Sequence, residues 1–350
     1  MLPIPVMKKA KEELLNFNQL GVSVIEISHR SKDFDNLLCE TDELFKKLVG
    51  LPDNYKILYV HGGAQMQFSA IPMNLMGRTP AKKAIYFETG YFAKVAAKEA
   101  AKYGTVITGG SGANTNYDRI PAVNTDAIEP DTSYAYITSN NTIYGTRWNQ
   151  FPDCGEVPLV VDATSEILSR EMDYHQYGLI FAGAQKNLGP SGLAMVIVRD
   201  DLLAYQRPDT PKLIDYTLCA EKHSLINTIN TFAVYIIHEV LVWLTNEGGI
   251  AEMEKRNDAK AQLLYQVIDQ SDFYASHAQP QDRSMMNVTF NLPNQDLLDR
   301  FLGEALENDL YALKGHRNVG GVRASIYNAM PAEGVKALVA FMKEFERRNG

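Results

Sequence analysis

The sequence has few cysteines and no excess of positive charge, and each shortage excludes a class of protein. Its three cysteines lack metal-ligand spacing and are too few for a disulfide framework, which favours a reducing compartment. The formal net charge is −8, so the chain lacks the basic surface on which nucleic-acid binding depends. We therefore expect no metal centre and no nucleic-acid partner.

Long apolar runs are also missing. The most apolar helical stretch, 231–245, is interrupted by His238 and Glu239 and is too short to span a bilayer. The opening residues, MLPIPVMKKAKEELL, have neither an arginine-rich transit pattern nor the apolar core of a signal peptide. With 350 residues, 45% of them apolar, the chain can bury a large core. We expect a cytoplasmic globular protein of two domains without membrane contact.

Short β-rich runs alternate with helix-like segments over most of the chain. Several runs are continuously apolar, as in a parallel sheet whose two faces are both covered. The β-rich runs as a whole are residues 22–28, 55–60, 83–89, 105–110, 133–139, 157–164, 178–184 and 192–200. This alternation predicts a large α/β domain with a mostly parallel sheet over residues 11–245.

The pattern changes after residue 246. Two strands and two helices are predicted there, at 284–292, 296–310, 321–327 and 333–349. The last helix places Val335, Leu338, Met342 and Phe345 at spacings of three and four, which marks one buried face. We predict a smaller α+β domain over 246–350, and we expect residues 1–10 to pack with it.

Three strand ends carry residues that suggest chemistry. Lys186 follows the run 178–184, Asp162 closes the run 157–164, and Gly62-Gly63 lead into a helix that begins near Ala64. Taken singly, such a lysine is more often a solvated loop residue, such an aspartate a cap and such a glycine pair a turn. Because the carboxyl ends of parallel strands meet at one edge of a sheet, together they fit pyridoxal phosphate (PLP). Lys186 would bond to this cofactor, and Asp162 would keep its ring nitrogen protonated.

Three groups of cationic residues are candidates for binding the substrate. They are His29-Arg30 in EISHRS, His316-Arg317 in LKGHRN, and Arg323 in GGVRASIY. Arginine binds carboxylate and phosphate through two parallel hydrogen bonds, which suggests recognition of a dianion. A surface role for the His-Arg pairs is equally consistent with the residues alone.

The segments AGAQKNLGPSGLAMVIVRDDLL, GGAQMQFSAIPMNLMG and ALKGHRNVGGVRASIYNAMP closely resemble those of the phosphoserine aminotransferases. These are class V aminotransferases of PLP fold type I, and the resemblance covers nearly the whole chain. It implies reversible amino transfer between glutamate and 3-phosphohydroxypyruvate, which gives phosphoserine and 2-oxoglutarate. In many bacteria it also implies action on a phosphorylated four-carbon oxo acid of pyridoxine biosynthesis.

The resemblance further implies a role for each matched residue that contacts the cofactor. Lys186 corresponds to the Schiff-base lysine, Asp162 to the partner of the ring nitrogen, Thr142 to a contact of the ring oxygen and Phe92 to the aromatic stacked on the ring. The residues implied at the cofactor phosphate are Ala64 and Gln65 through their backbone amides, Gln185 beside them, and Asn227 and Thr228 from the second subunit of a homodimer with shared active sites.

Substrate recognition is implied in the same way. Arg323 would bind the α-carboxylate. The distal phosphate or the γ-carboxylate would lie among His29, Arg30, His316 and Arg317, the last two from the partner chain.

The sequence departs from the family pattern at three places. Gln65 stands where some members have arginine, and Phe92 where others have tryptophan. The family's opening Asn-Phe-x-x-Gly-Pro segment has no counterpart, so we expect an N-terminally shortened version. Two alternatives stay open, namely another class V aminotransferase and a PLP-fold protein without catalysis. A cysteine desulfurase is disfavoured because Gln185, and not histidine, precedes the lysine.

Overall fold

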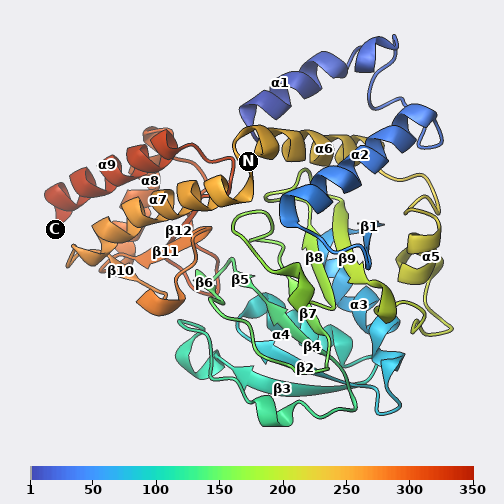
Figure 1. Ribbon diagram of the computed structural model, residues 1–350. Coiled ribbons are helices and arrows are strands. Elements are labelled where there is room, and N and C mark those ends of the chain that lie inside the picture. Colours follow the sequence, from blue (N-terminus) through green and yellow to red (C-terminus); the bar gives the residue numbers. More distant parts are fainter. Residues whose placement is uncertain (1) are drawn as a thin grey trace.

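The computed structural model describes residues 2–350, except the side chain of Asp126 (Figure 1). Its α-helices are α1 (Ile4–Glu13), α2 (Lys32–Val49), α3 (Gly63–Leu75), α4 (Tyr91–Ala100), α5 (Tyr216–Glu221), α6 (Thr231–Asn246), α7 (Gly249–Asp269), α8 (Gln295–Glu307) and α9 (Ala332–Asn349). Its strands are β1 (Tyr55–His61), β2 (Lys83–Glu88), β3 (Thr105–Ser111), β4 (Thr132–Thr138), β5 (Asn140–Asn141), β6 (Thr146–Arg147), β7 (Leu159–Asp162), β8 (Leu179–Gly183), β9 (Leu193–Arg199), β10 (Ala275–Ser276), β11 (Asn287–Asn291) and β12 (Val322–Ser325).

A seven-stranded sheet forms the centre of the molecule, in the order β1-β9-β8-β7-β4-β2-β3. Neighbouring strands are parallel except β9, which runs antiparallel to both β1 and β8. The predicted mostly parallel α/β sheet is therefore confirmed. Because β1, β8, β7 and β4 run in the same direction, their carboxyl ends lie at one edge of the sheet.

Both faces of this sheet are buried, which explains the continuous apolar runs. In β1, Ile57 and Tyr59 belong to the core that contains α2 and α6, whereas Leu58 and Val60 belong to the core under α3, α4 and α5. Side chains alternate between the faces of a strand, so each run supplies both cores at once.

The C-terminal residues form a three-stranded antiparallel sheet, β10-β11-β12, with α7, α8 and α9 packed on it. A third core lies between them and includes Phe290, Phe301 and Phe345. Helix α7 belongs to two cores, because Ile250 and Met253 pack with α6 while its later residues pack in the third core. The domain boundary at 245/246 stays a prediction. Within residues 2–350, no helix has both the length and the apolar character needed to cross a membrane.

The expected strand at 22–28 is wrong. This segment is a series of turns, in which Ser23 accepts a hydrogen bond from the amide of Ile25 (3.3 Å) and Glu26 accepts one from the amide of Ser23 (3.0 Å). Val24 and Ile27 are buried, but Ile25 is 58% exposed. Local hydrogen bonds of serine and glutamate thus override the β-branched composition.

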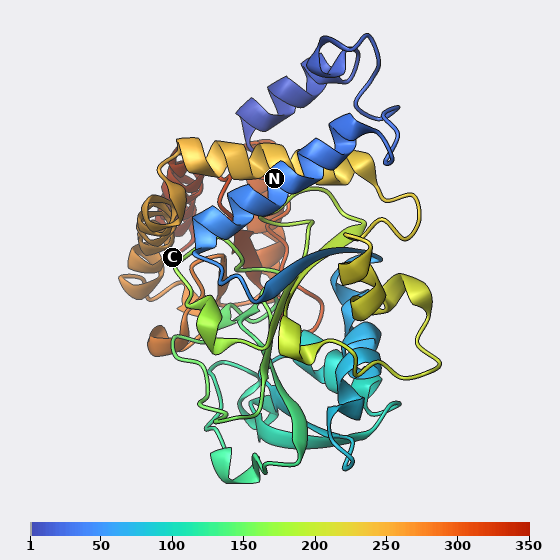
Figure 2. The ribbon, with the colours of Figure 1, turned by 45° about the vertical axis from the view of Figure 1, so that its right-hand side comes forward.

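Residues 2–10 also differ from expectation, and Met1 lies outside the described residues. Helix α1 packs along α6 and not against the smaller domain, as both views of the ribbon show (Figure 1, Figure 2). Val6 and Ala10 are buried in the core of α2 and α6. Tyr235 donates a hydrogen bond to Glu13 (2.6 Å), and Lys9 pairs with Glu239 (3.0 Å), so α6 supplies both apolar and charged contacts.

Candidate active site

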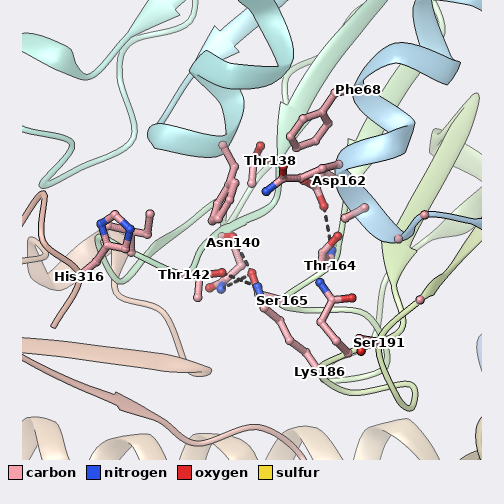
Figure 3. A pocket seen from close by; sticks show the side chains of 18 of the residues that line it. Phe68, Thr138, Asn140, Thr142, Asp162, Thr164, Ser165, Lys186, Ser191 and His316 are labelled. Carbon is pink, nitrogen blue, oxygen red and sulfur yellow. Dashed lines mark hydrogen bonds between the residues drawn. The ribbon is translucent and has the colours of Figure 1, made fainter. Parts of the chain in front are cut away.

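A cavity of about 560 Å³ opens where the strands end, between the large sheet and the C-terminal elements (Figure 3). Thr138 closes β4, Asp162 closes β7, and Lys186 follows β8; all three line it. His316 and Arg323 line it from the C-terminal part of the chain. Its size and its position beyond the carboxyl ends of parallel strands are typical of a small-molecule site.

Lys186 is held in the cavity by a tight turn after β8. The amides of Lys186 and Gly189 both donate to the carbonyl of Ala184, at 2.8 and 2.6 Å, and reverse the chain before β9. The half-buried side chain then points toward Thr142, whose hydroxyl accepts a hydrogen bond from Nζ at 2.7 Å (Figure 3). The lysine of the sequence segment 181–192 is therefore no freely solvated loop residue.

Asp162 is 4% exposed and faces the same cavity. Its Oδ1 accepts a hydrogen bond from the amide of Thr164 (3.0 Å), and the hydroxyl of Thr164 accepts one from the amide of Gly183 (3.2 Å), which ties the ends of β7 and β8 together. Burial raises the pKa of the Asp162 carboxyl, while Thr164 and the charge of Lys186 act in the opposite direction. A cationic ring nitrogen beside it would favour the ionised form.

The turn before α3 is shaped for an anion. Gly62 and Gly63 have φ values of 91° and 65°, and a Cβ on Gly62 would lie 2.8 Å from Cβ of Met66. No side chain within residues 2–350 caps α3, so amides of its first turn stay available, and Ala64 and Gln65 line the cavity. Free amides and the helix dipole together favour a phosphate at this end.

Arg323 provides the clearest sign of a missing partner. It stands on β12, opposite Thr289 on β11, and its buried Nε has no hydrogen-bond partner within residues 2–350. The buried hydroxyl of Thr138, which also lines the cavity, likewise has no hydrogen-bond partner in that range. Buried polar atoms are almost always hydrogen-bonded, so these two fit a site that takes a polar, anionic ligand. Together with Lys186 and Asp162, they fit PLP and an amino acid.

His316 lies in the wall of its own chain's cavity, although it was expected to come from a partner chain. Its ring centroid is 5.9 Å from that of Tyr91. Burial, aided by the charges of Arg323 and Arg317, lowers the pKa of His316. The neutral imidazole can both donate and accept a hydrogen bond.

The structure brings most of the predicted site residues together, namely Ala64, Gln65, Phe92, Thr142, Asp162, Gln185, Lys186, His316 and Arg323. The remaining ones do not line this cavity. His29 and Arg30 lie in the turn before α2, Arg317 is exposed, and Thr228 is exposed beside Asn227. Asn227 Oδ1 lies 3.2 Å from His61 Nε2, next to the glycine turn.

Sequence reasoning missed several polar residues of the cavity, among them Thr138, Asn140, Thr164 and Ser165. Asn140 joins the two parts of the chain, since its Nδ2 donates to Ser165 (2.9 Å) and to Asn287 of β11 (2.9 Å). The available signal was position alone, because each follows or ends a strand at the edge where Asp162 ends β7.

Comparison with known proteins agrees with this site. The family model for class-V aminotransferases matches residues 1–338. A phosphoserine aminotransferase of Geobacillus kaustophilus is 48% identical over 348 residues, covering 99% of this chain and 96% of the relative. One of Lysinibacillus sphaericus is 45% identical over 349 residues, with 99% and 96% covered.

Solved structures give the same result. The phosphoserine aminotransferase of Bacillus circulans subsp. alkalophilus superposes with a TM-score of 0.96 at 40% identity, covering 100% of this chain and 97% of that one. The PLP-bound enzyme of Trichomonas vaginalis gives 0.93 at 36% identity, with 98% and 97% covered. The expected PLP fold type I is thereby confirmed. The chain belongs to the class-V aminotransferases and, among them, to the phosphoserine aminotransferases.

Proposed function

We propose that this protein uses PLP to move the amino group of L-glutamate to 3-phosphohydroxypyruvate, giving O-phospho-L-serine and 2-oxoglutarate. One observation carries the proposal: a lysine, a buried carboxylate, the start of a helix and an arginine whose Nε has no partner among the described residues converge on a single cavity. Lys186 would bond covalently to the cofactor, and Asp162 would pair with its ring nitrogen. The Gly62–Gln65 turn would bind its phosphate.

When bound, PLP supplies an electron sink that stabilises negative charge at the substrate's Cα. Arg323 binds the α-carboxylate and so fixes the Cα–H bond relative to Lys186. The Lys186 amine would act as the base that takes the Cα proton of the substrate and then as the acid that gives a proton back. Asp162 would hold a proton at the ring nitrogen. The hydroxyl of Thr142 would keep the Lys186 amine in place by accepting its hydrogen bond.

The distal anion requires more cations than the cavity of one chain supplies. His316 is present there, whereas His29, Arg30 and Arg317 lie outside it. We propose that a homodimer completes the site, with these residues and Asn227 and Thr228 reaching the partner's cavity. We place the enzyme in the cytoplasm, in serine biosynthesis, with the phosphorylated four-carbon oxo acid of pyridoxine biosynthesis as a second substrate.

The cofactor assignment is tested with Lys186→Ala, and with Lys336→Ala on the exposed side of α9 as the matched control. We expect wild type and the control to show the visible absorption of lysine-bound PLP and to form phosphoserine, and Lys186→Ala to lose both. Persistence of that band in Lys186→Ala would remove the lysine from its role. Alanine serving as well as phosphoserine as amino donor would instead favour another class V aminotransferase.

Shared active sites are tested by mixing inactive subunits. Co-expressed Lys186→Ala and Arg30→Ala chains form hybrids in which one site has both an intact Lys186 and an intact Arg30, but only if Arg30 acts on the partner. Recovery of activity in the isolated hybrid supports the dimeric site. A hybrid no more active than Arg30→Ala alone would place Arg30 elsewhere.

A further inference from the structure

A buried lysine away from the cofactor cavity has no role in the mechanism above. Lys260 of α7 is 3% exposed, and none of the described carboxylates forms an ion pair with it. Its Nζ instead lies 3.2, 3.0 and 3.1 Å from the carbonyl oxygens of Ile326, Tyr327 and Met330. Burial lowers its pKa to about 8, so near neutral pH it keeps the three protons that these three acceptors use.

The three carbonyls belong to one short segment, residues 326–330, which follows β12 directly. Arg323 stands on β12, three residues before the segment begins. The middle of the segment contacts the loop that carries Lys186, because the amide of Asn328 donates to Oδ1 of Asn187 at 3.1 Å. In addition, the ring of Tyr327 lies 6.0 Å from Nζ of Lys186. The segment therefore connects the two residues that must act on one substrate.

Further buried hydrogen bonds fix the same segment. Asn257, one helical turn before Lys260, donates to Asn328 Oδ1 (2.9 Å) and to the carbonyl of Ser169 (3.0 Å). Asn328 Nδ2 donates to the carbonyl of Leu168 (2.8 Å). Lys260 and Asn257 of α7 thus bind backbone carbonyls of residues 326–330 and of Ser169, and buried hydrogen bonds of this kind restrict the movement of the segment.

We propose that Lys260 is a positioning residue for amino transfer: by holding three carbonyls of residues 326–330, it sets the distance between Arg323 and Lys186. The inference rests on the proposed function. The substrate's Cα proton must lie within reach of the Lys186 amine while its carboxylate is on Arg323. A misplacement of about 1 Å can cost roughly 100-fold in rate even when it arises far from the chemistry.

The test compares Lys260→Met, which keeps most of the length and removes all donors, with Lys260→Gln, which keeps two N–H donors. Lys255→Met, exposed on the same helix, is the control. The rate is counted per protein-bound cofactor from the visible absorption. We expect kcat to fall roughly 100-fold in Lys260→Met and less in Lys260→Gln, with KM for glutamate changed less than kcat and with the absorption retained.

A second readout uses the cofactor-free protein. Hydrogen exchange at the amides of Arg323 and Asn328 is expected to accelerate in Lys260→Met, while the amides of β8 keep their protection. A residue with a merely structural role would lower the melting temperature and leave kcat per bound cofactor as in wild type; that result overturns the proposal. If Lys260→Met does not fold, Lys260→Gln decides in the same way. Wild-type protein that fails to transaminate glutamate would refute the proposed function instead.

Discussion

The buried Nε of Arg323, which has no hydrogen-bond partner among the described residues, allows a prediction about function and stability together. In Arg323→Met the side chain keeps its bulk but loses the fork that binds a carboxylate. In Arg323→Lys a positive charge stays, although it acts as a point charge without the paired geometry. If the arginine is there for the substrate, both variants lose activity in that order, and neither loses stability.

The magnitude follows from the contacts. A hydrogen bond to a charged group contributes about 1.5–3 kcal/mol, so two of them to the α-carboxylate contribute about 3–6 kcal/mol. Since every 1.4 kcal/mol is tenfold, kcat/KM for glutamate is expected to fall roughly 10²- to 10⁴-fold in Arg323→Met and roughly 10- to 10²-fold in Arg323→Lys. In the cofactor-free protein, removal of a buried donor without a partner relieves a cost of about 1–3 kcal/mol.

The assay is steady-state transamination with glutamate varied at saturating oxo acid, beside urea unfolding of the cofactor-free proteins. Arg300→Lys, which alters an exposed arginine of α8, is the control for loss of an arginine. A loss in Arg323→Met of less than about 1.5 kcal/mol, the contribution of one such bond, would refute a bidentate role. Destabilisation of the cofactor-free variant would show that the guanidinium supports the fold.

Two further predictions concern titratable groups. Burial raises the pKa of Asp162, so at a pH above the ordinary carboxyl pKa its ionised form destabilises the cofactor-free fold. In urea unfolding at neutral pH, Asp162→Asn should therefore be at least as stable as wild type, yet it should lose most transaminase activity. A less stable, fully active variant would contradict both parts of this prediction. The hydrogen bond to Asp42 (2.8 Å) raises the pKa of His223. The stabilisation that this pair contributes is therefore complete below the ordinary histidine pKa and is lost as the pH rises through the raised pKa of His223. The difference in unfolding free energy between wild type and His223→Gln should accordingly shrink on going from acidic to alkaline buffer, and a difference independent of pH would show that the ion pair contributes nothing.

Prediction from the sequence succeeded where a residue pattern is compatible with a single structural environment. The apolar runs of the sheet were recognisable because burial on both faces leaves no alternation, and Lys186 and Asp162 stood at strand ends that parallel topology brings together. The segment 22–28 failed because its composition is β-like while Ser23 and Glu26 close local turns.

The network around Lys260 could not be predicted for a different reason. A lysine in an otherwise amphipathic helix resembles a solvated one, and its three acceptors are carbonyl groups, which every residue carries. Likewise Thr164 and Asn140 are ordinary in sequence, and only the register of β4, β7 and β8 brings them to the cavity. The role of Arg323 came from the resemblance, whereas its missing partner became visible only in three dimensions.

Helix α7 has a consequence for how the enzyme could move. Its 21 residues form a rod of roughly 32 Å whose first turns are embedded in one core and whose last turns are embedded in another. A hinge just before this rod would pull Ile250 and Met253 out of their apolar surroundings. Any adjustment to substrates of different length must therefore come from side chains and loops around a frame of constant shape.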